Sequence, residues 1–303
     1  MPTAIRADKS VSVFGPEGDP VALYKNLDLD FEAPQGMDYG SGKMYLTGCG
    51  SNTLATASET GEFEVWEIPE KEGRPRLQEP FDTAFYLENT NIAQLWVSGN
   101  SSKEVGDDKV GAIYVVNFAP INDQPPYEDI ESFYGDEISW PLGIDTDSQG
   151  VAWVANSRLV DIPCGPEKYH VDSNVGWVSS INYKTKHIER YQRGGLGAPW
   201  GLWIDSQDNV WISNFSSQKI SRLCANIDGC RGGIQYGEFF VDEGYRFLGY
   251  ERLTATRADP SDNLWAANNW IFDFINTPSS PGGSSVVAII GMANPEKGQG
   301  PEN

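Results

Sequence analysis

The chain has little positive charge, little cysteine and no long apolar run, and each shortage excludes a class of protein. Lys and Arg total 22 against 43 Asp and Glu, which gives a formal net charge of −21. An acidic chain lacks the basic surface that nucleic acids and anionic membranes require. No run of about 18 apolar residues is present, so we expect no membrane insertion. The first residues also lack a basic segment followed by an apolar core, so no secretory signal is visible, although a mature chain would have lost one.

The four cysteines suggest where the protein resides. Cys224 and Cys230 are separated by ANIDG and can close a small disulfide loop, which leaves Cys49 and Cys164 to pair over a long span. The close spacing of a zinc-binding cysteine pair is absent. The pattern favours an extracellular or periplasmic location. The alternative is a cytoplasmic protein with four reduced cysteines.

Internal repeats are the strongest feature of the sequence. Residues 141–156, 199–214 and 253–268 each read as a short apolar strand, a turn rich in Asp, Ser, Gly and Asn, and a second strand that carries Trp and ends in Asn. Weaker copies cover 33–48 and 81–100. The aromatic markers of the five copies are Tyr45, Trp96, Trp153, Trp211 and Trp265, at spacings of 51, 57, 58 and 54 residues.

A further pair of strands follows most copies, so each unit reads as a four-stranded antiparallel meander. The sequence therefore predicts an all-β fold, a single β-propeller domain over 1–303 with five blades in 33–292 and a tail at 293–303. The fifth unit lacks a fourth strand, and residues 1–32 offer spare strands, so we expect an N-terminal strand to complete the C-terminal blade and close the ring. A degenerate sixth blade and a two-sheet sandwich are the alternatives.

The repeats carry the pattern P-x-G-[IL]-x-[IV]-D-x-x-G-N-x-W-[VI]-x-N, as in PWGLWIDSQDNVWISN. This resembles NHL-repeat and streptogramin (virginiamycin B) lyase-like propellers and, more distantly, gluconolactonase/regucalcin-like (SMP-30) propellers. The resemblance implies a propeller fold and a family that includes lyases, lactonase-type hydrolases and plain binding scaffolds.

In propellers of this kind the Asp-rich turns lie at one face, and the starts of the repeats lie at the other with the residues that follow each Trp strand. Three long insertions, 157–176, 269–284 and 100–111, then gather on that second face, the top face. Long loops on one side of a rigid scaffold are the usual place for binding and catalysis. Drift of solvent loops is the alternative explanation.

Five top-face residues are candidates for substrate binding: Trp140, Trp200, Trp270, Arg158 and Asn269. Indole rings at a pocket mouth can stack on a flat or sugar-like ligand. For Trp140 and Trp200 the alternative is packing between blades. We expect Trp153, Trp211 and Trp265, which lie within strands, to pack in the core.

Asn156, Asn214 and Asn268 occupy one position in three repeats and are candidate ligands of a divalent cation, Ca²⁺ or Mg²⁺. Gluconolactonase-type propellers hold such an ion among Asn and acidic side chains. Here no Asp or Glu ends the equivalent strands. The alternative is that each Asn caps its strand end with side-chain hydrogen bonds to the backbone.

His170 and Glu167 lie together in the longest insertion and are the candidate catalytic pair, with His170 as general base. The second histidine, His187, reads as a turn residue. Streptogramin lyases carry strand ends similar to WFTE where this chain has WVAN, WISN and WAAN, so none of their catalytic residues carries over. No phosphate-binding glycine loop is present, so no nucleotide or organic cofactor is expected.

Two functions fit these features. The first is a propeller that binds a small organic molecule at the top of its channel and cleaves it as a lyase or lactonase. The second is a non-catalytic, secreted or envelope propeller whose top loops bind a protein or a glycan.

Overall fold

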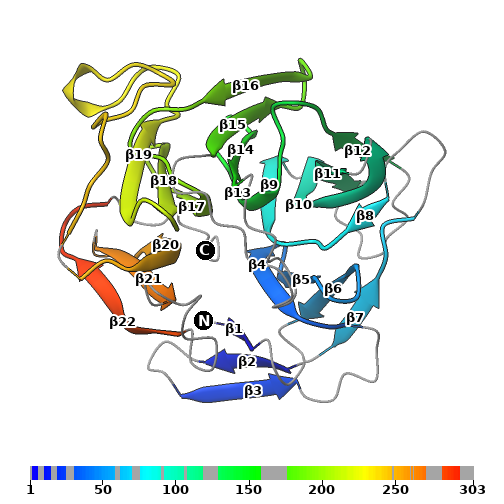
Figure 1. The fold of residues 1–303 in the computed structure, drawn as a ribbon. Helices are drawn as coiled ribbons and strands as arrows, with labels where there is room; N and C mark the ends of the chain where they lie inside the picture. Colours follow the sequence, from blue (N-terminus) through cyan, green and yellow to red (C-terminus); the bar gives the residue numbers. More distant parts are fainter. Residues whose placement is uncertain are drawn as a thin grey trace. The chain divides into compact units, whose positions relative to one another are not determined.

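The structure is a computed structural model that describes residues 2–5, 10–14, 19–24, 31–58, 62–69, 76–89, 92–105, 108–118, 129–157, 176–247, 249–259, 261, 263–270 and 282–293. These residues form antiparallel sheets, and their only helix is the short 3₁₀ turn Arg231–Gly233. No helix among them has the length and apolarity to cross a membrane. The all-β prediction is confirmed, and the successive meanders are the blades of a β-propeller (Figure 1).

The chain divides into two compact units, the first with β1 to β12 and the second with β13 to β22. The single-domain expectation stays a prediction. In the first unit one sheet holds β1 (Pro2–Ile5), β2 (Ser10–Phe14) and β3 (Pro20–Tyr24). The next holds β4 (Pro34–Gly40), β5 (Lys43–Gly48), β6 (Thr53–Ser58) and β7 (Phe63–Trp66). The third holds β8 (Leu77–Gln78), β9 (Thr83–Asn89), β10 (Ile92–Val105), β11 (Asp108–Phe118) and β12 (Asp129–Phe133).

The second unit also has three sheets. The first is formed by β13 (Pro141–Thr146), β14 (Val151–Asn156), β15 (Trp177–Asn182) and β16 (His187–Tyr191). The second holds β17 (Pro199–Ile204), β18 (Asn209–Asn214) and β19 (Lys219–Cys224). The third holds β20 (Arg252–Ala258), β21 (Leu264–Trp270) and β22 (Gly282–Ile289).

Two details differ from the sequence prediction. The N-terminal strands β1, β2 and β3 pair with one another as a separate sheet, in place of one strand completing the C-terminal blade, because short connections make local pairing easy. The expected insertion 100–111 is largely an extension of the β10–β11 hairpin, with Glu104 paired with Lys109.

The β17–β19 sheet in the second unit also differs from the prediction, at its expected fourth strand. The segment expected as the fourth strand of the β17–β19 sheet follows the edge of β19 through isolated bridges, Leu223 with Phe239 and Ile220 with Tyr245.

Neighbouring sheets are joined by one repeated hydrogen bond. In the first unit Asp38 Oδ2 on β4 accepts the backbone N–H of Phe85 on β9 at 2.6 Å. In the second unit Asp145 Oδ2 on β13 accepts that of Ile204 on β17 at 2.7 Å. The carboxylate thus satisfies a strand donor of the next sheet, and apolar side chains of both sheets fill the space between them.

The Asp-rich turns explain the tryptophan markers. Asp205 accepts the backbone N–H groups of Gln207 at 2.9 Å and Asn209 at 3.0 Å, and its Oδ2 accepts the indole N–H of Trp211 at 3.0 Å. One carboxylate therefore fixes the turn and the rotamer of the buried ring on the returning strand. The repeat preserves a hydrogen-bonded unit of Asp and Trp six residues apart.

The burial of these tryptophans depends on the next sheet. Trp153 and Trp211 are fully buried, as predicted, and Trp211 packs in a cluster with Leu253 and Leu264 of the following sheet. Trp265 is 44% exposed, so its predicted core position is wrong. The ring lies on the same exposed face of the β20–β22 sheet as Val286, which is 64% exposed.

Candidate functional site

The candidate site lies at the end of each sheet where the innermost strand begins and the second strand ends, which we call the entry end. In the second unit Pro199 pairs there with Asn214, and Leu253 pairs with Asn268. Both sequence-predicted sets, the strand-end asparagines and the tryptophans, meet at this end. The Asp turns lie at the opposite end of the same strands.

In the strand-end asparagines Asn214 and Asn268, both the Oδ1 and the Nδ2 atom of the side-chain amide make hydrogen bonds. Asn214 Oδ1 accepts the backbone N–H of Gly197 at 3.1 Å, and its Nδ2 donates to Ser221 Oγ at 2.9 Å. Asn268 Oδ1 accepts the N–H of Glu251 at 3.1 Å, and its Nδ2 donates to Ser285 Oγ at 3.0 Å. The structure therefore shows the capping alternative, in which each Asn joins a strand end to the chain that enters the next strand.

These bonds bear on the cation prediction. The amide oxygens of Asn214 and Asn268 face backbone donors, and Asn156 is fully buried with its Nδ2 donating to Ser179 Oγ at 3.0 Å. The oxygens of Asn214 and Asn268 each accept one backbone N–H, and the role of the three asparagines as ligands of a divalent cation stays a prediction. In the part of the chain that the structure describes, no group of three or more His, Cys, Asp or Glu side chains is placed to hold a metal.

An aromatic cluster joins two of the predicted binding residues. The ring of Phe215, directly after Asn214, lies 4.9 Å from Trp200 and 6.4 Å from Trp270 between centroids. Trp200 and Phe215 are buried and pack against each other within one sheet, whereas Trp270 is half-buried. Trp270 is thus the ring of the cluster that a ligand can reach.

Arg252 completes this cluster and was missed from the sequence. Its Nη1 donates to the carbonyls of Phe215 at 3.2 Å and Ser216 at 3.5 Å, and the guanidinium lies 5.3 Å from the centre of the Phe215 ring. Burial lowers the pKa of Arg252, but a guanidinium stays charged in proteins. Because the other strong repeats have Trp140 and Ala198 here, only its departure from the repeat could have drawn attention to it.

Glu251, the preceding residue, was also missed. Glu251 as a whole is partly exposed, but its Oε2 atom is enclosed and accepts no hydrogen bond from the described part of the chain. The backbone N–H is held by Asn268, so the residue is fixed at the entry to β20. The backbone of an acidic residue thus lies beside one of the strand-end asparagines.

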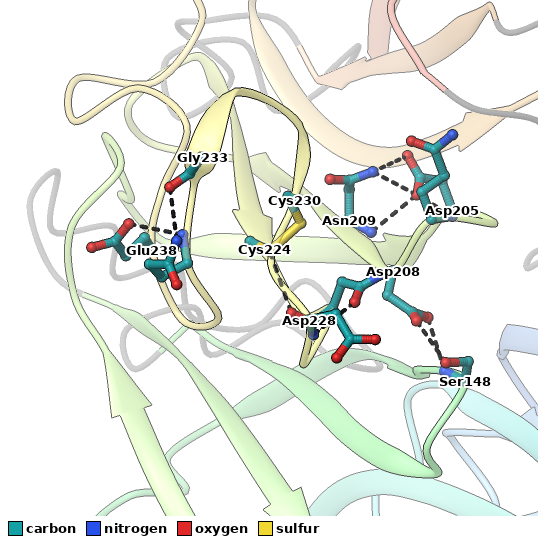
Figure 2. Close-up of a disulfide and its surroundings, with 12 residues drawn as sticks. Ser148, Asp205, Asp208, Asn209, Cys224, Asp228, Cys230, Gly233 and Glu238 are labelled. Atoms are coloured by element: carbon teal, nitrogen blue, oxygen red, sulfur yellow. Dashed lines mark hydrogen bonds between the residues drawn. A yellow bond between two sulfur atoms is a disulfide. The ribbon is translucent and has the colours of Figure 1, made fainter.

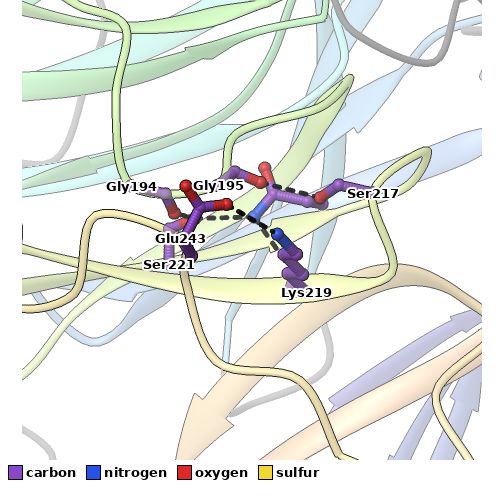
Figure 3. Close-up of polar contacts among 7 residues, drawn as sticks. Gly194, Gly195, Ser217, Lys219, Ser221 and Glu243 are labelled. Atoms are coloured by element: carbon purple, nitrogen blue, oxygen red, sulfur yellow. Dashed lines mark hydrogen bonds and ion pairs between the residues drawn. The ribbon is translucent and has the colours of Figure 1, made fainter.

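Glycines and serines hold the segment that enters β17 (Figure 3). Ser221 Oγ donates to the carbonyl of Gly194 at 2.5 Å, and Ser217 Oγ donates to that of Gly195 at 2.8 Å. Gly195 has a φ of +74°, and a Cβ there would collide with the carbonyl of Glu243. Glu243 also pairs with Lys219 at 3.6 Å. These contacts fix the entry end near Phe215.

The remaining predicted residues are distributed as follows. Asn269 is exposed beside Trp270. Trp140 is half-buried in the first unit, and its φ of +50° before a proline is a strained conformation for a large residue. His170, Glu167 and Arg158 lie outside the described residues, so their roles stay predictions.

The disulfide prediction is confirmed for one pair. Cys224 and Cys230 are bonded, with Cα atoms 5.9 Å apart, and close a loop beside the Asp205 and Asp208 turn (Figure 2). There Asp208 accepts both the N–H and the hydroxyl of Ser148, at 2.9 and 2.6 Å. Cys49 is also disulfide-bonded. Cys164 lies outside the described residues, so its pairing with Cys49 stays a prediction.

Comparison with known proteins identifies the fold. No protein-family model and no curated protein matches the chain. A solved structure of a catalytically inactive variant of virginiamycin B lyase from Staphylococcus aureus, with quinupristin, is 17% identical and superimposes with a TM-score of 0.56 over 86% of this chain and 71% of that one. A nidogen/laminin complex gives 15% identity and a TM-score of 0.55 over 93% and 85%. A luciferin-regenerating enzyme gives 13% and 0.51 over 86% and 77%.

At these identities the likeness shows the fold alone. The propeller fold and the fold-level resemblance to streptogramin lyases are confirmed.

Proposed function

We propose that the protein binds a small organic molecule at the entry end of its second unit and cleaves that molecule, as a lyase or a lactonase-type hydrolase. The observation that carries this proposal is the cluster of Trp200, Phe215, Trp270 and Arg252. A half-buried indole beside a fixed cation suits a flat ligand that carries a carbonyl or another polar acceptor.

The fold comparisons support the choice of reaction class. The virginiamycin B lyase and the luciferin-regenerating enzyme show that propellers of this shape serve as enzymes for small molecules. Glu251 supplies an ionisable group at the described entry end. His170 and Glu167 remain the proposed acid–base pair of the insertion, and Arg158 a proposed contact.

The experiment uses quinupristin and the aromatic lactone dihydrocoumarin as probes, with mass spectrometry of the products. Elimination opens a ring without changing the mass, and hydrolysis adds one water, so the product mass separates the two classes. We expect turnover of at least one probe and its loss in His170→Ala. No product from either probe would contradict the catalytic part of the proposal.

Trp270→Ala tests the location of the site, with Trp265→Ala as the matched control. Both tryptophans lie on β21, but Trp265 is near the Asp turn and Trp270 is at the entry end. We expect Trp270→Ala to weaken binding of the active probe by roughly tenfold or more, as loss of an aromatic anchor does. Equal effects of the two substitutions would contradict the assignment.

The second candidate is a non-catalytic propeller that binds a protein or glycan. The nidogen/laminin complex favours it, as does the exposed apolar face with Trp265, Val286 and Ile290. Specific binding through this face without turnover of either probe would favour this second function.

A further inference from the structure

The three sheets of the second unit differ in how their outer edges are protected. The outer strand of the first sheet, β16, carries exposed Glu189 and Arg190, and charged side chains discourage pairing with another chain. The outer edge of β19 is covered by the loop that follows it, where the backbone N–H of Phe240 donates to the carbonyl of Arg222 at 3.0 Å. Charge protects one edge and a covering segment protects the other.

The outer edge of β22 has neither protection among the described residues. β22 pairs with β21 on one side, and no described strand or bridge pairs with its other side. Residues 274–295, which include the whole of β22, contain no charged side chain, in a chain in which 21% of the residues are charged. An open and uncharged edge presents backbone groups that can pair with another strand.

The sheet face beside this edge is apolar and exposed. Val286 on β22 is 64% exposed, and Trp265 on β21 is 44% exposed and pairs with Ala288. Ile290, directly after β22, is 77% exposed. The charged side chain on this face, Arg257, lies on β20, two strands away from the edge, where it pairs with Trp265. The edge and the apolar face can therefore be buried together.

Charge favours a second copy of the chain as the partner. The net charge of −21 makes two copies repel each other, and contact through the uncharged run 274–295 brings the fewest like charges together. A basic partner would find its attraction at the acidic surfaces and not at this strand. Two identical strands that pair antiparallel also form a self-complementary contact, as a two-fold interface requires.

We propose that the outer edge of β22 is a self-association surface, at which two copies of the chain pair antiparallel and join their β20–β22 sheets. One strand edge and a few apolar side chains bury less than the about 800 Å² per partner of a standard interface, so the dimer is weak and depends on concentration. The proposal does not rest on the proposed function, because the entry end, where Trp270 pairs with Gly282, lies at the start of β22.

Sedimentation velocity of the whole protein, from low to high micromolar concentration, tests the proposal. We expect a reversible monomer–dimer equilibrium that salt strengthens, because screening weakens the repulsion between acidic copies. Val286→Lys and Val286→Glu should both weaken the dimer by roughly tenfold or more, since a charge of either sign opposes burial of the edge.

The matched controls are Ile227→Lys and Ile227→Glu. Ile227 is 65% exposed, much as Val286 is, but it lies in the loop that the Cys224–Cys230 disulfide closes. These substitutions change charge and hydrophobicity in the same way and should leave the dimer unchanged. Equal weakening by the two pairs of variants would overturn the assignment to β22.

Hydrogen exchange locates the contact. Amides of β22 should exchange more slowly at high than at low protein concentration, while those of the charged edge β16 should exchange equally at both. Protection at β16 without protection at β22 would overturn the proposal.

Two further outcomes would also overturn it. A protein that stays monomeric at every concentration would show that a second copy is not the occupant of this edge. A marked fall of Tm in Val286→Lys would show that the face is packed within the chain itself. Neither outcome bears on the proposed function, which the quinupristin and dihydrocoumarin assays decide independently.

Discussion

Trp153 Nε1 donates to Asp147 Oδ2 at 2.9 Å, and the bond recurs between Trp211 and Asp205 at 3.0 Å and between Trp265 and Asp259 at 2.8 Å. Three copies of one hydrogen bond, six residues apart in each repeat, thus occur in three environments. The first two rings are fully buried and the third is exposed. The repeat therefore provides its own internal controls.

Asp205→Ala should destabilise the protein strongly. It removes the turn bonds to Gln207 and Asn209 and leaves the buried Trp211 indole N–H unpaired, a loss of about 2 to 3 kcal/mol. Urea unfolding measures the change. Asp259→Ala is the control, and its smaller effect follows from the exposure of Trp265. Equal losses would contradict the dependence on burial.

The pKa values of Asp147 and Asp259 should be shifted in opposite directions from the ordinary value of an Asp carboxyl. Burial raises the pKa of Asp147 above its ordinary value of 3.8, although its hydrogen bonds to Trp153 and two backbone groups act against the rise. At Asp259 the bonds to Trp265 and Asn263 lower the pKa to about 2. Carboxyl ¹³C NMR across acidic pH measures both values.

The two shifts have opposite consequences for stability. The lowered pKa of Asp259 contributes stability that is present above 3.8 and lost as the pH falls from 3.8 to about 2. The pKa of Asp147 is raised in the folded chain, so the folded chain binds more protons than the unfolded chain at pH values just above 3.8. The contribution of Asp147 to stability therefore falls as the pH rises from 3.8 through its raised pKa. Similar midpoints for the two carboxyls would contradict this account.

Asp145→Ala should loosen the contact between the first two sheets of the second unit. The substitution leaves the N–H of Ile204 without its 2.7 Å acceptor, and we expect a loss of about 1 to 3 kcal/mol. Hydrogen exchange of the Ile204 amide should accelerate more than that of amides in β22. Unchanged exchange at Ile204 would show that the bond does not form in solution.

Removal of the Cys224–Cys230 disulfide by a double substitution to Ser should cost about 2 kcal/mol, since the closed loop is short. Thermal unfolding with and without the substitution gives the value. Mass spectrometry without reductant provides the check, and detection of four alkylatable thiols in the native protein would contradict the bond.

Much of the fold followed from the regular tryptophan spacing. Strands of alternating pattern, Asp-rich turns and the short Cys224–Cys230 loop are local features, and local features are readable from sequence. The separate sheet β1–β3 and the extended β10–β11 hairpin were not, because pairing partners depend on which edges the fold leaves open.

The site was less accessible to prediction. Trp200 and Trp270 were found from their position in the repeat, but Phe215 between them reads as an ordinary core residue. Glu251 carries no local signal, because only the folded chain shows that its Oε2 is enclosed without a donor. The exposure of Trp265 likewise depends on the tertiary surroundings of its strand, which no spacing reveals.

The central claim is that a small organic molecule binds at the entry end of the second unit. Hydrogen exchange of the whole protein with and without a saturating probe, quinupristin or dihydrocoumarin, tests it most directly. The account predicts protection at residues 249–253, 214–216 and 268–270, and none at the Asp147, Asp205 and Asp259 turns. Protection confined to those turns, or no protection in the second unit, would contradict it.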